Sequence, residues 1–284
     1  MNKYTLPELE KMGIQPGTRH GLPVYHIRNL YAEAEISPYG AHVLSYTPQG
    51  EKDLLWLSGK SWFEEGKPIR GGIPVCWPWF GDAGTPKHGI ARIAMWEMET
   101  ARVEADRSTT LIFSLDRQEL CGLTARLLVN AGSSLSLALR TKNHGTSSHT
   151  LSEALHTYFA VKDITKVSIL GLDQDDLSEE EKLFPNFRKG RLTFRQETDL
   201  VCYPDEKILV IDDAGEGRKI RVERAGSATA VVWNPWIAKS KAMPDFGDDE
   251  YKTMVCVEAA NAREGAVGII PGAAHTLRTR ISLI

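Results

Sequence analysis

Two side chains in apolar surroundings have the residue types that proton transfer requires. Glu258 ends the apolar run in TMVCVEAANA, and carboxylates are seldom buried without a partner or a task. His156 has apolar and aromatic neighbours in ALHTYFAV, and its imidazole titrates near neutral pH. Period-two alternation predicts that Met254, Cys256 and Glu258 share one face of a strand. Both candidates have a structural alternative, because Glu258 could pair with an arginine at a strand end and His156 could be a hydrogen-bonded core residue.

Residues 68–92, PIRGGIPVCWPWFGDAGTPKHGIAR, combine cationic, aromatic, glycine and proline residues. That much Gly and Pro would weaken a core strand, whereas a solvent-exposed loop would not need Trp77 and Phe80. The composition predicts a tightly turned, partly buried segment that holds cations around a pocket. The alternative is a packed loop whose arginines only contact water. In the first case Arg70 and Arg92 suit an anion, because a guanidinium matches phosphate oxygens in a bidentate way.

Several segments of the chain occur in an order and at separations that match a known family. They are IRGGIPVCWPWFG followed by PKHGIAR, then HTYFAV from His156, ETDLVCY from Glu197, VVWNPW from Val231 and MVCVEAAN from Met254. In these motifs the chain resembles the glucose-6-phosphate 1-epimerase (hexose-6-phosphate mutarotase) family, a branch of the aldose-1-epimerase-like proteins. The resemblance spans roughly residues 30–284.

The resemblance implies a fold and a reaction. The fold would be all-β, a large antiparallel β-sandwich of the galactose mutarotase type with a few short helices. The reaction would interconvert the α and β anomers of a hexose 6-phosphate, with glucose 6-phosphate as the expected substrate. A base removes the C1 hydroxyl proton, an acid protonates the ring oxygen, and the opened ring closes on its other face. None of these steps needs a metal or a cofactor, so we expect neither.

The resemblance also assigns roles to residues. It makes Glu258 the base and His156 the acid. His88 matches a second histidine of the family, which holds the sugar or its ring oxygen, and it is the second candidate for the acid or a helper to it. Asp199 resembles an acceptor for sugar hydroxyls, a role that suits the two oxygens of a carboxylate.

The expected phosphate clamps are Arg70 and Arg92, which match arginines that the family uses for substrate. Lys87 is a further candidate, although relatives often have glutamine at this position. Relatives also carry a Tyr-Asp pair where residues 175–177 of this chain read Asp-Asp-Leu. Contacts from the loop at 173–191 are therefore not predicted.

Three other functions remain open on the residues alone. The chain could be a mutarotase for unphosphorylated aldoses, or a sugar-phosphate binding protein without catalysis. Glycoside hydrolysis would need two carboxylates, for which Asp199 and Glu258 could serve, but a histidine acid fits that chemistry poorly. The sequence has no phosphate-binding P-loop and no nucleophile elbow.

Composition narrows the class of protein further. The 284 residues are 42% hydrophobic and 25% charged, with a formal net charge of −3 and scattered basic residues, so nucleic acid is not an expected partner. The N-terminus lacks the apolar segment of a signal peptide, and no stretch is long enough to span a bilayer. We expect a cytoplasmic monomer that binds a small sugar phosphate. The four cysteines form no C-x-x-C pair, which predicts buried thiols in a reducing compartment.

The pattern along the chain favours many short strands in one domain of residues 1–284. Thr5 and Glu8 have capping-box spacing, which predicts a short helix over residues 5–12. Strands are expected near 24–29, 32–37, 42–47, 54–59, 94–102, 109–115, 253–258, 266–270 and 275–284. TARLLVN and LSLALRTKN, joined at residues 131–134, predict a hairpin. Residues 173–191 and 238–251 read as polar excursions, and the first lacks the ligand and glycine positions of a calcium loop.

Overall fold

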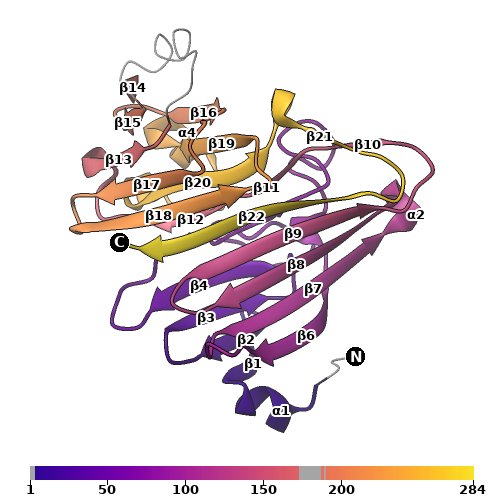
Figure 1. Ribbon diagram of the computed structural model, residues 1–284. Coiled ribbons are helices and arrows are strands. Elements are labelled where there is room, and N and C mark those ends of the chain that lie inside the picture. Colours follow the sequence, from indigo (N-terminus) through magenta and orange to yellow (C-terminus); the bar gives the residue numbers. More distant parts are fainter. Residues whose placement is uncertain (1–3, 173–186, 189) are drawn as a thin grey trace.

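Antiparallel β-sheets dominate the computed structural model, which describes residues 4–172, 187–188 and 190–284 (Figure 1). One sheet has ten strands, another six, and two smaller sheets have four and two. The all-β sandwich predicted from the sequence is confirmed. None of the helices in the described part of the chain has the length and hydropathy needed to cross a membrane.

The ten-stranded sheet forms the largest layer and contains the predicted hairpin. In spatial order its strands are β14 (Phe187–Arg188), β15 (Arg191–Thr193), β13 (Val167–Leu170), β17 (Ile208–Asp213), β18 (Arg218–Ala225), β22 (Ala274–Leu283), β9 (Leu135–Asn143), β8 (Leu123–Ala131), β7 (Thr109–Arg117) and β6 (Glu97–Val103). The hairpin is β8–β9, with Ala131 paired to Leu135 across residues 132–134. Its alternate leucines Leu135, Leu137 and Leu139 are buried, as period-two alternation predicts.

Three smaller sheets complete the strand framework. The six-stranded sheet contains β16 (Thr198–Cys202), β19 (Thr229–Asn234), β20 (Met254–Asn261), β11 (Glu153–Leu155) and β5 (Val75–Cys76), and β12 (Tyr158–Ala160) also pairs with β20. The four-stranded sheet runs β1 (Ile14–Arg19), β2 (Leu22–Arg28), β3 (Ala32–Ser37) and β4 (His42–Pro48), and the last sheet pairs β10 (His149–Leu151) with β21 (Val267–Ile269).

The helices are short and lie at the margins of the sheets. Those in the described residues are α1 (Leu6–Lys11), α2 (Gln118–Cys121) and α4 (Trp236–Ala242), with 3₁₀ turns at Ala91–Ile93, Ile164–Lys166, Glu250–Thr253 and Arg263–Gly265. The predicted N-terminal helix is confirmed, and its Glu8 carboxylate accepts from the Thr5 backbone N–H at 2.7 Å. The excursion at 238–251 contains most of α4. Residues 173–186 and 189 of the other excursion lie outside the described residues.

Two sequence predictions need correction. Residues 54–59 form no strand and make only isolated bridges, Leu55 to Phe159 and Leu57 to Gly71, because the chain crosses other segments there instead of running beside one. Cys121 is only half-buried at the end of α2, whereas Cys76, Cys202 and Cys256 are buried as expected. No disulfide joins the four cysteines, all of which lie in the described residues.

β20 is the strand around which the site is built. All eight of its residues are buried, so both of its faces are covered. One face packs toward β18 and β22 of the large sheet. The other face supports a smaller apolar cluster that includes Val201, Val231 and Ala262. A polar side chain on this second face, such as Glu258, is therefore desolvated by its position.

Glu153, on β11, is a buried carboxylate away from that face. It is fully buried, accepts weak hydrogen bonds from Asn261 (3.3 Å) and Thr141 (3.4 Å), and lies 3.4 Å from His275 Nε2. Burial raises its pKa from an ordinary 4.5 to about 8. The folded state therefore favours the neutral acid, and ionisation of Glu153 opposes folding.

We expect Glu153→Gln to change how stability depends on pH. A carboxyl with a raised folded pKa carries no penalty below pH 4.5, and its destabilising effect grows as the pH rises from 4.5 to about 8. This one group can change the free energy of unfolding by at most about 1.4 kcal/mol per pH unit. Urea unfolding from pH 5 to pH 8 should show the variant losing less stability than the wild type. Parallel stability curves would contradict the assignment.

Candidate active site

Strand register brings His156 and Glu258 face to face. On either side of His156, Leu155 pairs with Ala259 and Tyr158 pairs with Cys256, so the antiparallel register puts His156 directly opposite Glu258. His156 Nδ1 lies 3.3 Å from Glu258 Oε1. The sequence expectation that these two side chains converge at one place therefore holds in the structure.

Two cross-strand rows form the floor of the site. One row is Val201, Val231, Glu258 and His156, and the row beside it is Asp199, Trp233, Cys256 and Tyr158. Antiparallel neighbours in one row point to the same side of the sheet. The candidate base on β20, the candidate acid between β11 and β12 and the hydroxyl acceptor on β16 thus come from segments far apart in sequence.

Burial sets the protonation of the acid–base pair. The side chains of Glu258 and His156 are 1% and 10% exposed. Burial, with a contribution from Asp199, raises the pKa of Glu258 well above its usual 4.5. Burial, then His88 and Arg70, lowers the pKa of His156 well below 6.5. Both shifts favour the uncharged forms, and moving one proton from Glu258 to His156 converts the pair into the carboxylate and imidazolium that proton exchange with a hemiacetal requires.

Arg70 is held in place by a partner that the sequence did not reveal. It makes a bidentate pair with Asp245, with Nε to Oδ2 at 3.1 Å and Nη2 to Oδ1 at 3.3 Å, and Nη1 donates to the Tyr158 hydroxyl at 3.1 Å. Asp245 is buried and Arg70 retains 21% of its side-chain exposure. Three of the five N–H groups of Arg70 are thus engaged, and two are left for a ligand.

Arg92 and Lys87 stand together at the mouth of the site. Arg92 Nη2 donates to the Lys87 carbonyl at 2.7 Å, and its other N–H groups make no hydrogen bond within the described chain. Lys87 Nζ lies 3.1 Å from Asp82 and its side chain is 59% exposed. Arg92 is therefore better placed than Lys87 to offer its charge to an anion.

His88 has a defined tautomer and orientation. Its Nδ1 accepts from the Gly81 backbone N–H at 3.3 Å, which leaves the ring proton on Nε2. Its ring meets His156 edge to face at 5.6 Å and Phe80 at 4.9 Å. Burial, then Arg92 and Lys87, lowers its pKa to about 3. His88 is thus a neutral donor beside the acid–base pair.

Asp199 lies on the rim and is 58% exposed. Lys239 of α4 reaches across to it at 3.9 Å and pairs more closely with Glu197 at 2.7 Å. The rim therefore offers both a carboxylate and an ammonium group to sugar hydroxyls.

A cavity of about 640 Å³ connects these residues. All seven residues predicted from the sequence line it: Arg70, Lys87, His88, Arg92, His156, Asp199 and Glu258. Lining residues not predicted for the site include Ser152, Tyr158, Lys239 and Arg263. Tyr158 could have been found, because it follows His156 by one strand period. Among the tryptophans, Trp233 lines the cavity, whereas Trp236 packs on Tyr251 and Trp79 donates a hydrogen bond to the Pro86 carbonyl.

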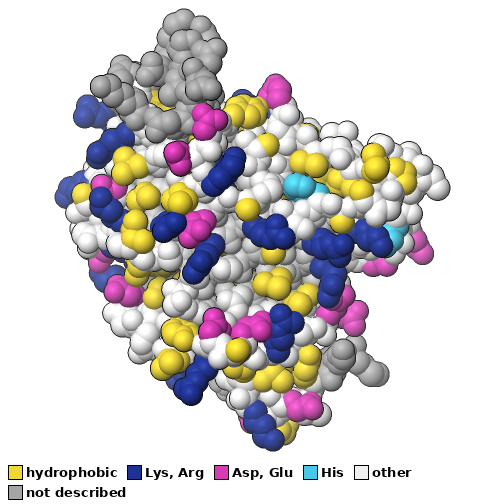
Figure 2. Space-filling model, in the orientation of Figure 1, with side chains coloured by type: hydrophobic (Ala, Val, Ile, Leu, Met, Phe, Trp, Pro, Cys, Tyr) yellow, Lys and Arg dark blue, Asp and Glu magenta, His cyan; other side chains and the backbone are white. Residues whose placement is uncertain are grey.

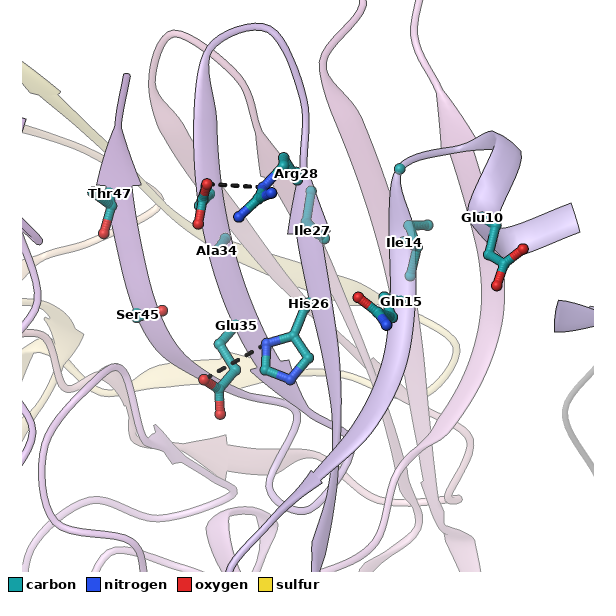
Figure 3. A pocket seen from close by; sticks show the side chains of 12 residues that line it. Glu10, Ile14, Gln15, His26, Ile27, Arg28, Ala34, Glu35, Ser45 and Thr47 are labelled. Carbon is teal, nitrogen blue, oxygen red and sulfur yellow. Dashed lines mark ion pairs between the residues drawn. The ribbon is translucent and has the colours of Figure 1, made fainter. Parts of the chain in front are cut away.

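A second hollow, of about 770 Å³, lies on the outer face of the four-stranded sheet (Figure 3). Its side chains stand in rows across β1 to β4, with His26 facing Glu35 at 3.8 Å and Arg28 paired to Glu33 at 2.8 Å. The Arg28–Glu33 pair is largely exposed, and His26 shows no burial comparable to that of His156. Although this hollow is larger, it lacks a desolvated acid–base pair.

Surface charge is mixed on the face shown in Figure 2, where acidic side chains occur among the lysines and arginines.

Comparison with known proteins identifies the fold and the family. A crystal structure from Salmonella typhimurium, described as a "putative mutarotase (YeaD)", matches with a TM-score of 0.85 at 30% identity, covering 100% of this chain and 95% of that one. A galactose mutarotase-like protein from Lactobacillus casei shares the fold alone, with a TM-score of 0.69 at 14% identity over 92% of this chain and 100% of that one. The fold and the cavity therefore define a mutarotase-like β-sandwich protein.

The family model described as aldose 1-epimerase matches residues 23–282. The chain belongs to the aldose 1-epimerase family. Two relatives carry the name "Putative glucose-6-phosphate 1-epimerase". The one from Escherichia coli K12 is 39% identical over 242 residues (82% of this chain, 81% of that protein), and the one from Cenchrus ciliaris is 37% identical over 267 residues (88% and 80%).

Proposed function

We propose that this protein is a hexose-6-phosphate mutarotase that interconverts the α and β anomers of a sugar such as glucose 6-phosphate. The observation that carries the proposal is the buried pair of Glu258 and His156, 3.3 Å apart at the floor of a cationic cavity. A hemiacetal presents its hydroxyl and its ring oxygen on one carbon, so two proton-transfer groups this close can serve both oxygens. The relatives' names support the choice of a phosphorylated hexose.

The chemistry follows from the positions of the groups. Glu258, as carboxylate, accepts the proton of the C1 hydroxyl while His156, as imidazolium, donates its Nε2 proton to O5. The C1–O5 bond breaks and C1 becomes a carbonyl carbon. Because Nδ1 of His156 faces Glu258, Nε2 is the ring nitrogen available to the sugar. After rotation about C1–C2, the reverse transfers close the ring on the opposite face and restore both groups.

The anionic end of the substrate suits the cationic side of the cavity. Arg92 has unpaired N–H groups there, and Arg70 has two remaining donors. A bound phosphate would also counter the positive charges that lower the pKa of His156, which makes protonation of the acid easier in the complex. His88 through Nε2 and Asp199 through its carboxylate are positioned to hold ring hydroxyls.

Exchange NMR tests the proposal directly. The rate of interconversion between the anomers of glucose 6-phosphate should rise above the spontaneous rate in proportion to protein concentration. Glucose and galactose are run beside it, because a preference for the free sugars would favour an ordinary aldose 1-epimerase. Binding of the phosphate ester without any rate enhancement would instead favour a binding protein.

Arg92→Ala should reduce selectivity for the phosphate. Hydrogen bonds to charged groups contribute about 1.5–3 kcal/mol, so we expect kcat/KM for glucose 6-phosphate to fall about 10- to 150-fold. The rate of anomer exchange of unphosphorylated glucose should change little. Lys87→Ala is the matched comparison, and its effect should be smaller because Lys87 is exposed and paired with Asp82. Equal losses of kcat/KM for glucose 6-phosphate and for glucose would show that Arg92 does not recognise the phosphate.

A further inference from the structure

Cys256 shares the floor of the cavity with the acid–base pair but has no part in proton transfer. A ring nitrogen of His156, Sγ of Cys256 and a carboxylate oxygen of Glu258 all lie within 4.8 Å of one another. All three side chains are buried. Cys256 stands in the row beside Glu258, one strand period away on β20, so its thiol comes from the same face of the same strand.

Two of the polar atoms in this group have no hydrogen-bond partner. His156 Nδ1 and Glu258 Oε2 are both buried and unpartnered within the described chain. His156 Nδ1 and Glu258 Oε1 approach to 3.3 Å without forming a hydrogen bond. Buried polar atoms of this kind are costly and call for an explanation. A cation placed between them would accept both lone pairs at once.

We propose that His156, Cys256 and Glu258 bind one zinc ion, with the fourth coordination position open to the cavity. Imidazole, thiolate and carboxylate together form a donor set that zinc accepts and that magnesium and calcium do not favour. Zinc bonds of 2.0–2.3 Å place tetrahedral ligand atoms about 3.3–3.8 Å apart. The 3.3 Å between Nδ1 and Oε1 already fits, and because no separation in the group exceeds 4.8 Å, the ligand atoms need to approach by at most about 1.5 Å.

The ion would inhibit the protein. Zinc takes the carboxylate that would accept the C1 hydroxyl proton and fixes the imidazole that would protonate O5. Metal and sugar therefore exclude each other, and metal binding displaces the thiol proton of Cys256 and the carboxyl proton of Glu258. The inhibition rests on the proposed mutarotase function, whereas the metal site does not.

Cobalt(II) titration of the whole chain tests the site independently of activity. Tetrahedral cobalt with one thiolate ligand gives visible d–d bands and a near-ultraviolet sulfur-to-metal charge-transfer band. We expect both bands to saturate at one equivalent in the wild type and to be displaced by zinc. Cys256→Ser should lose the charge-transfer band, and Glu258→Gln should weaken metal affinity by at least about tenfold. Cys202→Ala is the matched control, because it removes a buried thiol from β16 and leaves the three ligands in place.

Anomer exchange then tests the consequence. Zinc should slow anomer exchange by the wild type and by the Cys202→Ala variant, and a chelator should restore both rates. The Cys256→Ser variant, compared with its own zinc-free rate, should need at least about tenfold more zinc for the same inhibition. Absence of the charge-transfer band, or its persistence in Cys256→Ser, overturns the metal site even if exchange is fast. A band in the wild type without any catalysed exchange leaves the metal site standing and removes the proposed function.

Discussion

Glu258→Gln and His156→Asn should each lower the catalysed rate of anomer exchange by about 10²–10⁴-fold, because positioned proton transfer contributes that much per group. Glutamine keeps the shape of the glutamate side chain but cannot take the C1 hydroxyl proton. Asparagine keeps a polar group but cannot supply a proton to O5. Exchange NMR at saturating glucose 6-phosphate measures the effect on kcat.

The two groups act on one hemiacetal, so their effects should not add. The double variant should be little slower than the worse single variant, since the loss of either partner already stops the coupled transfer. Glu153→Gln is the matched control, because it replaces another buried carboxyl group, on the adjacent strand, that does not line the cavity. Its exchange rate should equal that of the wild type. A Glu258→Gln protein with wild-type kcat would exclude Glu258 as the base.

Asp245→Ala should be the most destabilising of the substitutions considered. It leaves the Arg70 guanidinium in a largely buried position with only Tyr158 as a partner. Burial alone would lower the pKa of Arg70, but Tyr158 and Asp245 together raise it, so Arg70 stays charged. Breaking a buried pair from one side costs about 3–5 kcal/mol. Urea unfolding followed by tryptophan fluorescence measures the loss.

A matched control lies three residues away. Asp248 pairs with Lys60 at 3.3 Å, but both side chains are more than half exposed, so Asp248→Ala should change stability by less than about 0.5 kcal/mol. Adding Arg70→Met to Asp245→Ala should recover part of the lost stability, because the unpaired charge is then removed. Equal free energies of unfolding for Asp245→Ala and Asp248→Ala would show that the Arg70–Asp245 pair does not stabilise the fold.

The local residue pattern of the sequence was sufficient to predict many of the strands and the N-terminal helix. The period-two leucines of β9 and the capping residues Thr5 and Glu8 act through neighbours close in the chain, and the corresponding strand and helix are confirmed. Residues 54–59 show the limit of this approach, because their apolar run reflects burial between segments and forms no strand.

The resemblance to a known family, together with residue type, also selected the candidate side chains of the site. All seven predicted site residues line one cavity, although their roles remain predictions. Asp245 was not assigned a role, since an aspartate in a polar excursion is usually solvated and only its burial against Arg70 makes it important.

The sequence by itself determined which residues can exchange protons or hold an anion, because those capacities belong to the side chains. Tertiary structure decided which of them meet. The register of β11 and β12 against β20 sets His156 opposite Glu258, and the same register brings Cys256 beside them. That pairing joins residues about a hundred positions apart, and burial of both faces of β20 supplies the desolvation that shifts their pKa values. Neither long-range register nor burial can be read from neighbours in the chain.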